Sequence, residues 1–226
     1  MTGFAPGAGH AAEVAGGAPA PDTTPRGRLL AAARRVLTRD GLEGLTLRAI
    51  AREAGVSHGA PLRHFPSLAA LLAAVAAEGF TWLADSIDTD LAAAEAGAVA
   101  AGSVSTPRQR LAVAGRAYLR FALDDPGLFS VTFRPERIDV SDVEYLTQGF
   151  RAFSQLRDLV EAAQADGWLP DLPATDLAGV LWAHVHGIAT LAIHGGLVGV
   201  IEGDDAVDRL MGLSISITVG PEGDTR

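Results

Sequence analysis

Residues 46–65, TLRAIAREAGVSHGAPLRHF, carry the side chains whose types and spacing best fit one chemistry, the recognition of double-stranded DNA. The pattern predicts a helix, a tight turn at Gly55 and Val56, and a second short helix, which is a helix-turn-helix layout. Gly55 can adopt a positive φ, and the small Ala51 lets the two helices cross closely. The second helix then presents a polar face to the major groove, formed by Ser57, His58, Gly59, Arg63 and His64.

A plain pair of packed helices would show the same layout, but the charge distribution favours a DNA partner. The 226-residue chain has a formal net charge of −9, yet residues 22–74 hold eight arginines and only four acids. Residues 75–226 hold ten arginines and 22 acids. A DNA-binding protein needs cations only where it touches phosphates, so the overall acidity does not exclude DNA. The basic and acidic parts are therefore predicted to have different partners.

The composition excludes several kinds of enzyme. The chain has no cysteine and no lysine, so it cannot form disulfides, thiolate metal sites, Schiff bases or the lysine contact of a phosphate-binding P-loop. It also lacks a G-x-S-x-G elbow and an H-E-x-x-H motif. His184 and His186 lie about 200° apart around a helix, and His194 is two turns farther on, so these residues do not predict a metal site. We therefore predict a protein that is not an enzyme and needs no cofactor.

Aromatic and polar residues in the acidic part could line a cavity for a small molecule. Trp182 and His186 are four residues apart and share one face of a helix, which could place a polar imidazole in an apolar pocket. The alternative is that His186 is a core histidine with a backbone partner and that the aromatic residues only pack. The candidate ligand-binding residues are Phe121, Phe129, Phe133, Trp182 and His186.

Helical periodicity runs through the chain from Arg26 onward, which predicts an all-α fold. In the basic part it predicts a first helix ending at Gly41, a second capped by Thr46, a third capped by Ser57, and a fourth from Leu68 to about Ala94. In the acidic part it predicts helices over 107–124, 126–133, 141–166, 174–194 and 204–218, separated by prolines. Residues 214–219 alternate like a strand, but we favour a helix because no partner strand is visible.

Composition divides the chain into a small helical head and a larger helical body. Residues 1–21 are mostly Ala, Gly and Pro without periodicity and are predicted to be a disordered tail, not a secretory signal. The head covers 22–67, the body covers 68–219, and 220–226 form a second tail. No stretch is a convincing membrane span, so we expect a cytoplasmic protein without a membrane partner.

The head resembles the N-terminal domain of the tetracycline-repressor (TetR) family of bacterial transcriptional regulators over about fifty residues. That family shows a helix ending in glycine, a T-hydrophobic-x-x-I-A core, A-G-V-S, a short helix ending in aromatic residues, and F-P-S. The matching residues are Gly41, Thr46–Ala51, Ala54–Ser57 and Phe65–Ser67. The resemblance implies a three-helix DNA-binding domain whose DNA contacts come from Thr46, Arg48, Ser57, His58, Gly59, Arg63, His64 and Ser67.

Three residues depart from the family pattern. Leu62 stands where a tyrosine usually contacts a phosphate, and Leu68 stands where a lysine often does. Pro61 lies inside the short helix, where its missing N–H removes one hydrogen bond from the first turn. These departures put the set of DNA contacts in doubt more than the function.

The body resembles one branch of the family's C-terminal domains, through residues 125–129 (DPGLF) and the W-x-x-V-H-G motif of residues 182–187. The resemblance implies a homodimer that binds a palindromic DNA operator and is released by an unknown small-molecule inducer. The helices beginning near Thr175 and Asp204 would form the dimer interface. The alternative is a helical module that binds a ligand or a protein and does not bind DNA.

Overall fold

The described chain is helical throughout, as the sequence predicts. The computed structural model describes residues 23–197, 200–201, 203 and 205–220, so the predicted tail 1–21 and nearly all of the tail 220–226 lie outside the described residues. Within these residues there are eight α-helices and three short 3-10 helices. They are α1 (Pro25–Asp40), η1 (Leu42–Gly44), α2 (Leu47–Glu53), η2 (Pro61–Arg63), α3 (Leu68–Ala100), α4 (Pro107–Asp124), α5 (Pro126–Thr132), η3 (Pro135–Arg137), α6 (Val143–Ala165), α7 (Ala174–Ile193) and α8 (Ala206–Thr218).

Short polar side chains and prolines set where most of the helices begin. The hydroxyls of Thr46 and Ser67 accept from the backbone N–H groups three residues ahead, at 3.1 Å in both cases, and so begin α2 and α3. At α4, Thr106 and Gln109 form a reciprocal capping box. Prolines occupy the first position of α1, α4 and α5, where a missing N–H costs nothing. The predicted starts of α2, α3, α4 and α5 are confirmed, and residues 214–218 are helical in α8.

In the head, α1 and α2 pack through an apolar core that includes Leu29, Val36 and Ile50. Two glycines with positive φ, Gly41 and Gly55, end α1 and reverse the chain after α2, as predicted.

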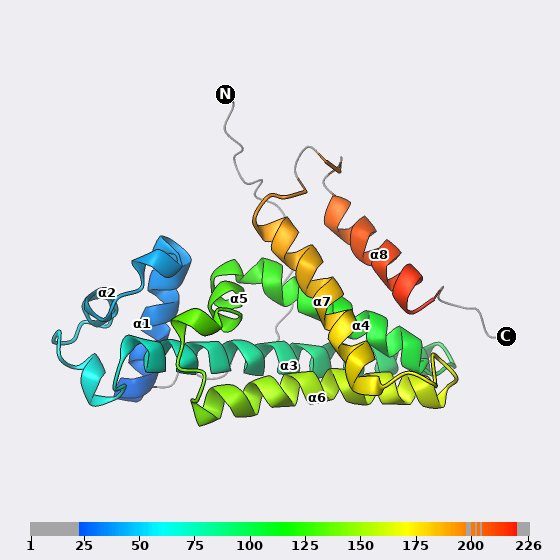
Figure 1. Ribbon diagram of the computed structural model, residues 1–226, viewed down its shortest axis with the longest axis horizontal. Helices are drawn as coiled ribbons and strands as arrows, with labels where there is room; N and C mark the ends of the chain where they lie inside the picture. The colour runs from blue at the N-terminus through cyan, green and yellow to red at the C-terminus, as the bar shows by residue number, and fades with distance from the viewer. Residues whose placement is uncertain (1–22, 198–199, 202, 204, 221–226) are drawn as a thin grey trace.

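The long helix α3 runs from the head along the body, and α1, α4, α5 and α6 pack against it. Figure 1 shows α6 lying beside α3, with α4 on another side of α3. Helix α7 packs on α4 and α6 at an angle, and α1 and α2 form the head at one end. Residues 70–77 of α3 are all buried, so this part of the helix has no solvent-facing side.

Two helices, α3 and α7, are long and apolar enough to cross a membrane by length and composition alone. The sequence predicted no membrane-spanning helix, and it predicted that α3 ends near Ala94. The helix instead continues to Ala100. Burial inside the protein accounts for α3, because 67% of its most apolar window is buried. In α7 only 17% of that window is buried, so its apolar surface is left open by this single chain.

Helix α5 approaches α3 closely at Gly79. A Cβ placed on Gly79 of α3 would lie 2.0 Å from Oγ1 of Thr132 and 3.3 Å from its Cβ. Thr132 has no exposed surface, and its hydroxyl donates to the Leu128 carbonyl at 2.7 Å, so the side chain cannot swing away. Gly79 is therefore required by packing and not by its φ angle.

We predict opposite effects for two glycine substitutions in α3. Gly79→Ala should lower the free energy of unfolding by about 1–3 kcal/mol, because the new methyl group overpacks the contact with Thr132. Gly97→Ala is the matched control; it has open space around its Cβ position and should raise stability by up to about 1 kcal/mol. Urea unfolding followed by circular dichroism measures both, and equal stability of the two variants would contradict the close α3–α5 contact.

Candidate functional site

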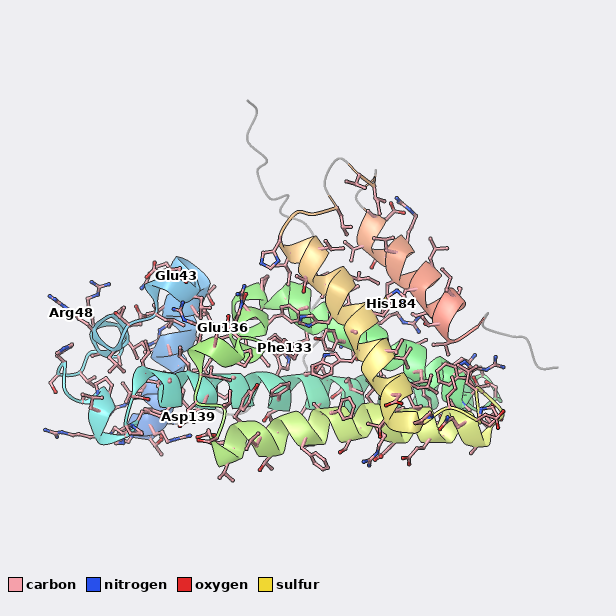
Figure 2. The ribbon with its side chains drawn as sticks, in the orientation of Figure 1. Glu43, Arg48, Phe133, Glu136, Asp139 and His184 are labelled. Atoms are coloured by element: carbon pink, nitrogen blue, oxygen red, sulfur yellow. The ribbon has the colours of Figure 1, made fainter. Side chains whose placement is uncertain are left out.

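The predicted DNA-contacting residues all lie on the surface of the head. Each of the eight is exposed: Thr46, Arg48, Ser57, His58, Gly59, Arg63, His64 and Ser67. Figure 2 shows Arg48 at the outer end of the head, away from the body. Their apolar neighbours Ile50 and Phe65 are buried, so the segment has one buried side and one free polar side. This arrangement allows the polar residues to contact a large partner without unfolding the head.

The structure corrects one local prediction, because Ser57 does not cap a short α-helix. Residues 57–64 form turns and the 3-10 helix η2, in which Ala60 N–H donates to the Ser57 carbonyl at 2.9 Å. In an α-helix that carbonyl would accept from residue 61, but Pro61 has no N–H. The three-residue spacing therefore replaces the four-residue spacing of an α-helix. The polar face predicted for an α-helix is instead carried by a tight turn, with Pro61 and Phe65 buried beneath it.

Four of the eight head arginines are held in ion pairs. Arg35 and Arg39 both donate to Glu53, at 2.8 and 2.9 Å, and Arg39 also pairs with Asp40. These hydrogen bonds hold the pKa of the Glu53 carboxyl below its usual range. Arg34 and Arg26 pair with acids of the body.

The other four arginines are exposed: Arg28, Arg48, Arg52 and Arg63. Within the described part of the chain, none of them has an acid within ion-pair distance, although Arg52 lies close enough to Asp40 to lower its pKa. The sequence analysis did not select Arg28 and Arg52 as candidates. Their positions off the apolar faces of α1 and α2 were the signal that could have identified them.

The hydroxyl groups that cap α2 and α3 can still donate a hydrogen bond to a phosphate. The oxygens of Thr46 and Ser67 accept the capping hydrogen bonds, which leaves each hydroxyl hydrogen available to an outside acceptor. Both side chains can therefore fix a helix end and contact a phosphate oxygen at the same time.

The body contains a cavity of about 390 Å³, partly open to solvent, between α3, α4, α6, α7 and α8. Of the five predicted ligand-binding residues, Phe133 and Trp182 line it. Figure 2 shows Phe133 in the body between α5 and α7. Phe121, Phe129 and His186 are not among the residues that line it. Phe121 and Phe129 are 1% and 3% exposed and pack behind the wall, against Trp82 and Tyr118.

His186 is held by a side-chain hydrogen-bond chain that the sequence analysis did not find. The indole of Trp182 donates to the Tyr118 hydroxyl at 3.2 Å, and that hydroxyl lies 2.8 Å from Nδ1 of His186. Because indole is only a donor, the Tyr118 hydrogen is free to donate to a neutral His186. Burial supports both neutral forms, since it raises the pKa of Tyr118 and lowers the pKa of His186. Tyr118 stands 68 residues before His186, so no local spacing could have identified it.

The histidines of the body do not gather around one point. His184 is exposed, His186 is bound to Tyr118, and Nδ1 of His194 lies 2.8 Å from the Thr190 carbonyl. In the described ranges, no three His, Asp or Glu side chains lie close enough together to hold a metal ion.

The lowered pKa of His186 predicts a pH effect on stability. An unfolded histidine binds a proton near pH 6.5, whereas the folded His186 resists protonation, so acid favours the unfolded chain. The urea midpoint of the wild type should fall between pH 7 and pH 5, and His186→Gln should reduce that fall. His194→Gln, which changes an exposed histidine, should leave it unchanged. An identical pH profile for the wild type and His186→Gln would show that His186 is not protected from protonation.

Two parts of the chain match known families. Residues 29–75 match the bacterial regulatory proteins of the tetR family, and residues 111–213 match the tetracyclin repressor-like C-terminal domain. These regions contain the helix-turn-helix segment and most of the cavity wall. No curated protein matches the chain.

Solved structures share the same fold. A protein of unknown function from Rhodococcus sp. RHA1 is 32% identical, with 89% of this chain and 96% of that chain covered and a TM-score of 0.69. The TetR family regulator PfmR from Thermus thermophilus is 15% identical, with 86% and 99% covered and a TM-score of 0.60. The regulator FadR from Bacillus subtilis, solved with stearoyl-CoA, is 14% identical, with 86% and 98% covered and a TM-score of 0.59.

These matches decide between the two functions that the sequence left open. They favour a DNA-binding regulator over a helical module that does not bind DNA, because the matched N-terminal region contains α2, the Gly55 turn and η2. The chain belongs to the tetR family of bacterial regulatory proteins and is a DNA-binding transcriptional regulator.

Proposed function

We propose that this regulator is a cytoplasmic repressor, that it binds a palindromic operator as a homodimer, and that a small molecule in the body cavity releases it. The observation that supports this most directly is the cavity of about 390 Å³, because ligand pockets typically measure about 300–1,000 Å³. FadR from Bacillus subtilis, which shares the fold, was solved with stearoyl-CoA.

The proposal assigns the functions to separate parts of the chain. Residues 22–67 would contact DNA, and residues 68–219 would bind the ligand and form the dimer. We assign the body to the branch with the W-x-x-V-H-G motif, which Trp182, Val185, His186 and Gly187 supply. The DNA contacts would come from the eight exposed residues named above, with Arg28 and Arg52 as further cations.

Helix α5 provides a physical connection between the cavity and the head. Phe133, which lines the cavity, directly follows α5. At the other end of α5, Asp125 pairs with Arg34 of α1 at 3.4 Å, and the site of a Cβ on Gly127 lies 3.1 Å from Leu37. A ligand that displaces Phe133 would therefore move a helix that touches α1. It would release DNA only if it binds the two conformations with different affinities.

The open surfaces of α7 and α8 support a homodimer. Val180, His184 and Leu191 are exposed along one face of α7, and Leu213 and Ile217 are exposed on the neighbouring α8. Gly187, on the same side of α7, has open space around its Cβ position and would allow a partner helix to approach closely. We propose that two copies bury these faces against each other in a four-helix interface.

Salt dependence tests the DNA contact. Affinity for a random-sequence duplex falls with salt by about 0.9 log units per log unit for each neutralised phosphate. Arg63→Ala should reduce this slope by about one unit, because Arg63 is exposed and has no ion pair among the described residues. Arg110→Ala, which removes the same charge from an exposed position on α4, is the control and should leave the slope unchanged. Equal slopes for Arg63→Ala and the wild type would remove Arg63 from the phosphate contacts.

Analytical ultracentrifugation tests the dimer. Ile217 is 79% exposed on α8, and Ile217→Glu should convert the dimer to a monomer by placing a charge in the interface. Val99→Glu places the same charge at a site that is 64% exposed at the far end of α3, and it should remain dimeric. A monomeric wild type, or a dimeric Ile217→Glu, would contradict the proposed interface.

A further inference from the structure

The wall of the body cavity contains no charged side chain among the residues that the structure describes. Most lining residues are aliphatic or aromatic. The polar ones are Tyr118, Tyr145, Trp182, His184, Ser214 and Thr218. The chain has no lysine, so arginine is its only permanent cation for this purpose.

The arginines of α6, the helix that supplies much of the wall, are held outside the cavity by acids. Arg151 donates to Asp85 at 2.7 Å and to Asp88 at 3.2 Å, and Arg157 pairs with Asp158 and Glu161. A carboxylate, sulfonate or phosphate held against these wall residues would lose part of its hydration without a cationic partner in the wall, which is unfavourable. The wall therefore selects against anionic ligands.

Three of the six polar side chains of the wall, those of Tyr118, Trp182 and Thr218, hydrogen-bond within the protein. Tyr118 accepts from Trp182 and donates toward His186, so its only hydrogen is used. Thr218 donates to the Ser214 carbonyl at 2.6 Å. The Ser214 hydroxyl differs, because the residue is 8% exposed and no described residue hydrogen-bonds to its side chain. This hydroxyl can donate one hydrogen bond and accept two, and Ser214 is more deeply buried than Tyr145 and His184, the remaining polar residues of the wall.

We propose that the cavity binds an uncharged, mainly apolar small molecule with one hydrogen-bonding group placed against Ser214. This inference rests on the proposed function, since it names the chemical class of the inducer. The volume of about 390 Å³ is equivalent to about 13 molecules of liquid water, so the ligand is a compact molecule. Helix α8 supplies both Ser214 and the neighbouring Met211 and Ile215 to the wall, so a bound ligand would contact the helix proposed for the dimer interface.

Two fluorescent probes that differ by one charge test the selection against anions. N-phenyl-1-naphthylamine is uncharged, and 1-anilinonaphthalene-8-sulfonate has the same rings with an added sulfonate. We expect saturable binding of the uncharged probe to the full-length protein and at least about tenfold weaker binding of the sulfonate, a difference of about 1.4 kcal/mol or more. Sulfonate binding as tight as that of the uncharged probe would overturn the proposal.

Cavity variants show whether the probe is inside. Ala114→Leu and Ala152→Leu each add bulk from a different helix, α4 or α6, and should each weaken binding of the uncharged probe. A melting curve for each variant identifies one that fails to fold, and the other then provides the test. If each variant that folds binds the uncharged probe as tightly as the wild type does, the probe lies elsewhere and the proposal is overturned.

A matched ligand pair tests the role of Ser214. Competition against the uncharged probe should show 1-naphthol binding about 2- to 10-fold more tightly than naphthalene, as expected for one hydrogen bond. In Ser214→Ala this ratio should fall to about one while naphthalene affinity stays unchanged. A ratio that persists in Ser214→Ala would overturn the assignment of Ser214.

These outcomes are separable from failure of the proposed function. If the uncharged probe binds but does not weaken DNA binding, the ligand class stands and this compound does not act as an inducer. If DNA binding and the dimer are intact but no uncharged compound enters the cavity, the ligand class is wrong while the regulator remains.

Discussion

The structure depends on one segment of α3, residues 70–77, that is buried on every side. Residues 70–77 of α3 have almost no solvent contact, because α1, α4, α5 and α6 all pack around this helix. Several neighbours can approach one helix only if some of its residues are small. Alanines 73, 74, 76 and 77 and Gly79 meet this need, and Gly79 does so at the closest contact, with Thr132. The head and the body therefore share one structural axis and do not form two independent cores.

Sharing one axis makes the head sensitive to events in the body. The ion pairs between the two parts, such as Arg34 with Asp125 and Arg137 with Glu43, involve partly exposed side chains and contribute little energy individually. The apolar contact between α5 and Leu37 of α1 is more important for stability, while the ion pairs fix orientation. Because α5 also leads into the cavity wall at Phe133, we propose that a displacement there would reach α1 through α5.

The DNA-binding segment shows how one residue can change a local structure without removing its surface. Pro61 takes away the N–H that an α-helix would need, and the chain forms a 3-10 turn. The burial of Pro61 and Phe65 still anchors this turn to the head, so the polar residues around it stay exposed. Local hydrogen bonding decides the helix type here, whereas tertiary packing decides which side faces outward.

The sequence alone determined the helical class, most helix ends and a set of polar head residues that the structure leaves exposed. These features follow from periodicity, capping residues and charge, which act over a few residues. Tertiary structure decided which aromatic residues meet the cavity, since Phe121 and Phe133 look equivalent in sequence but only Phe133 reaches the wall. It also decided that Tyr118 bonds to His186 and that half of the head arginines are paired. Those outcomes depend on the direction in which distant helices approach, and that direction is set by the packing of the whole core around α3.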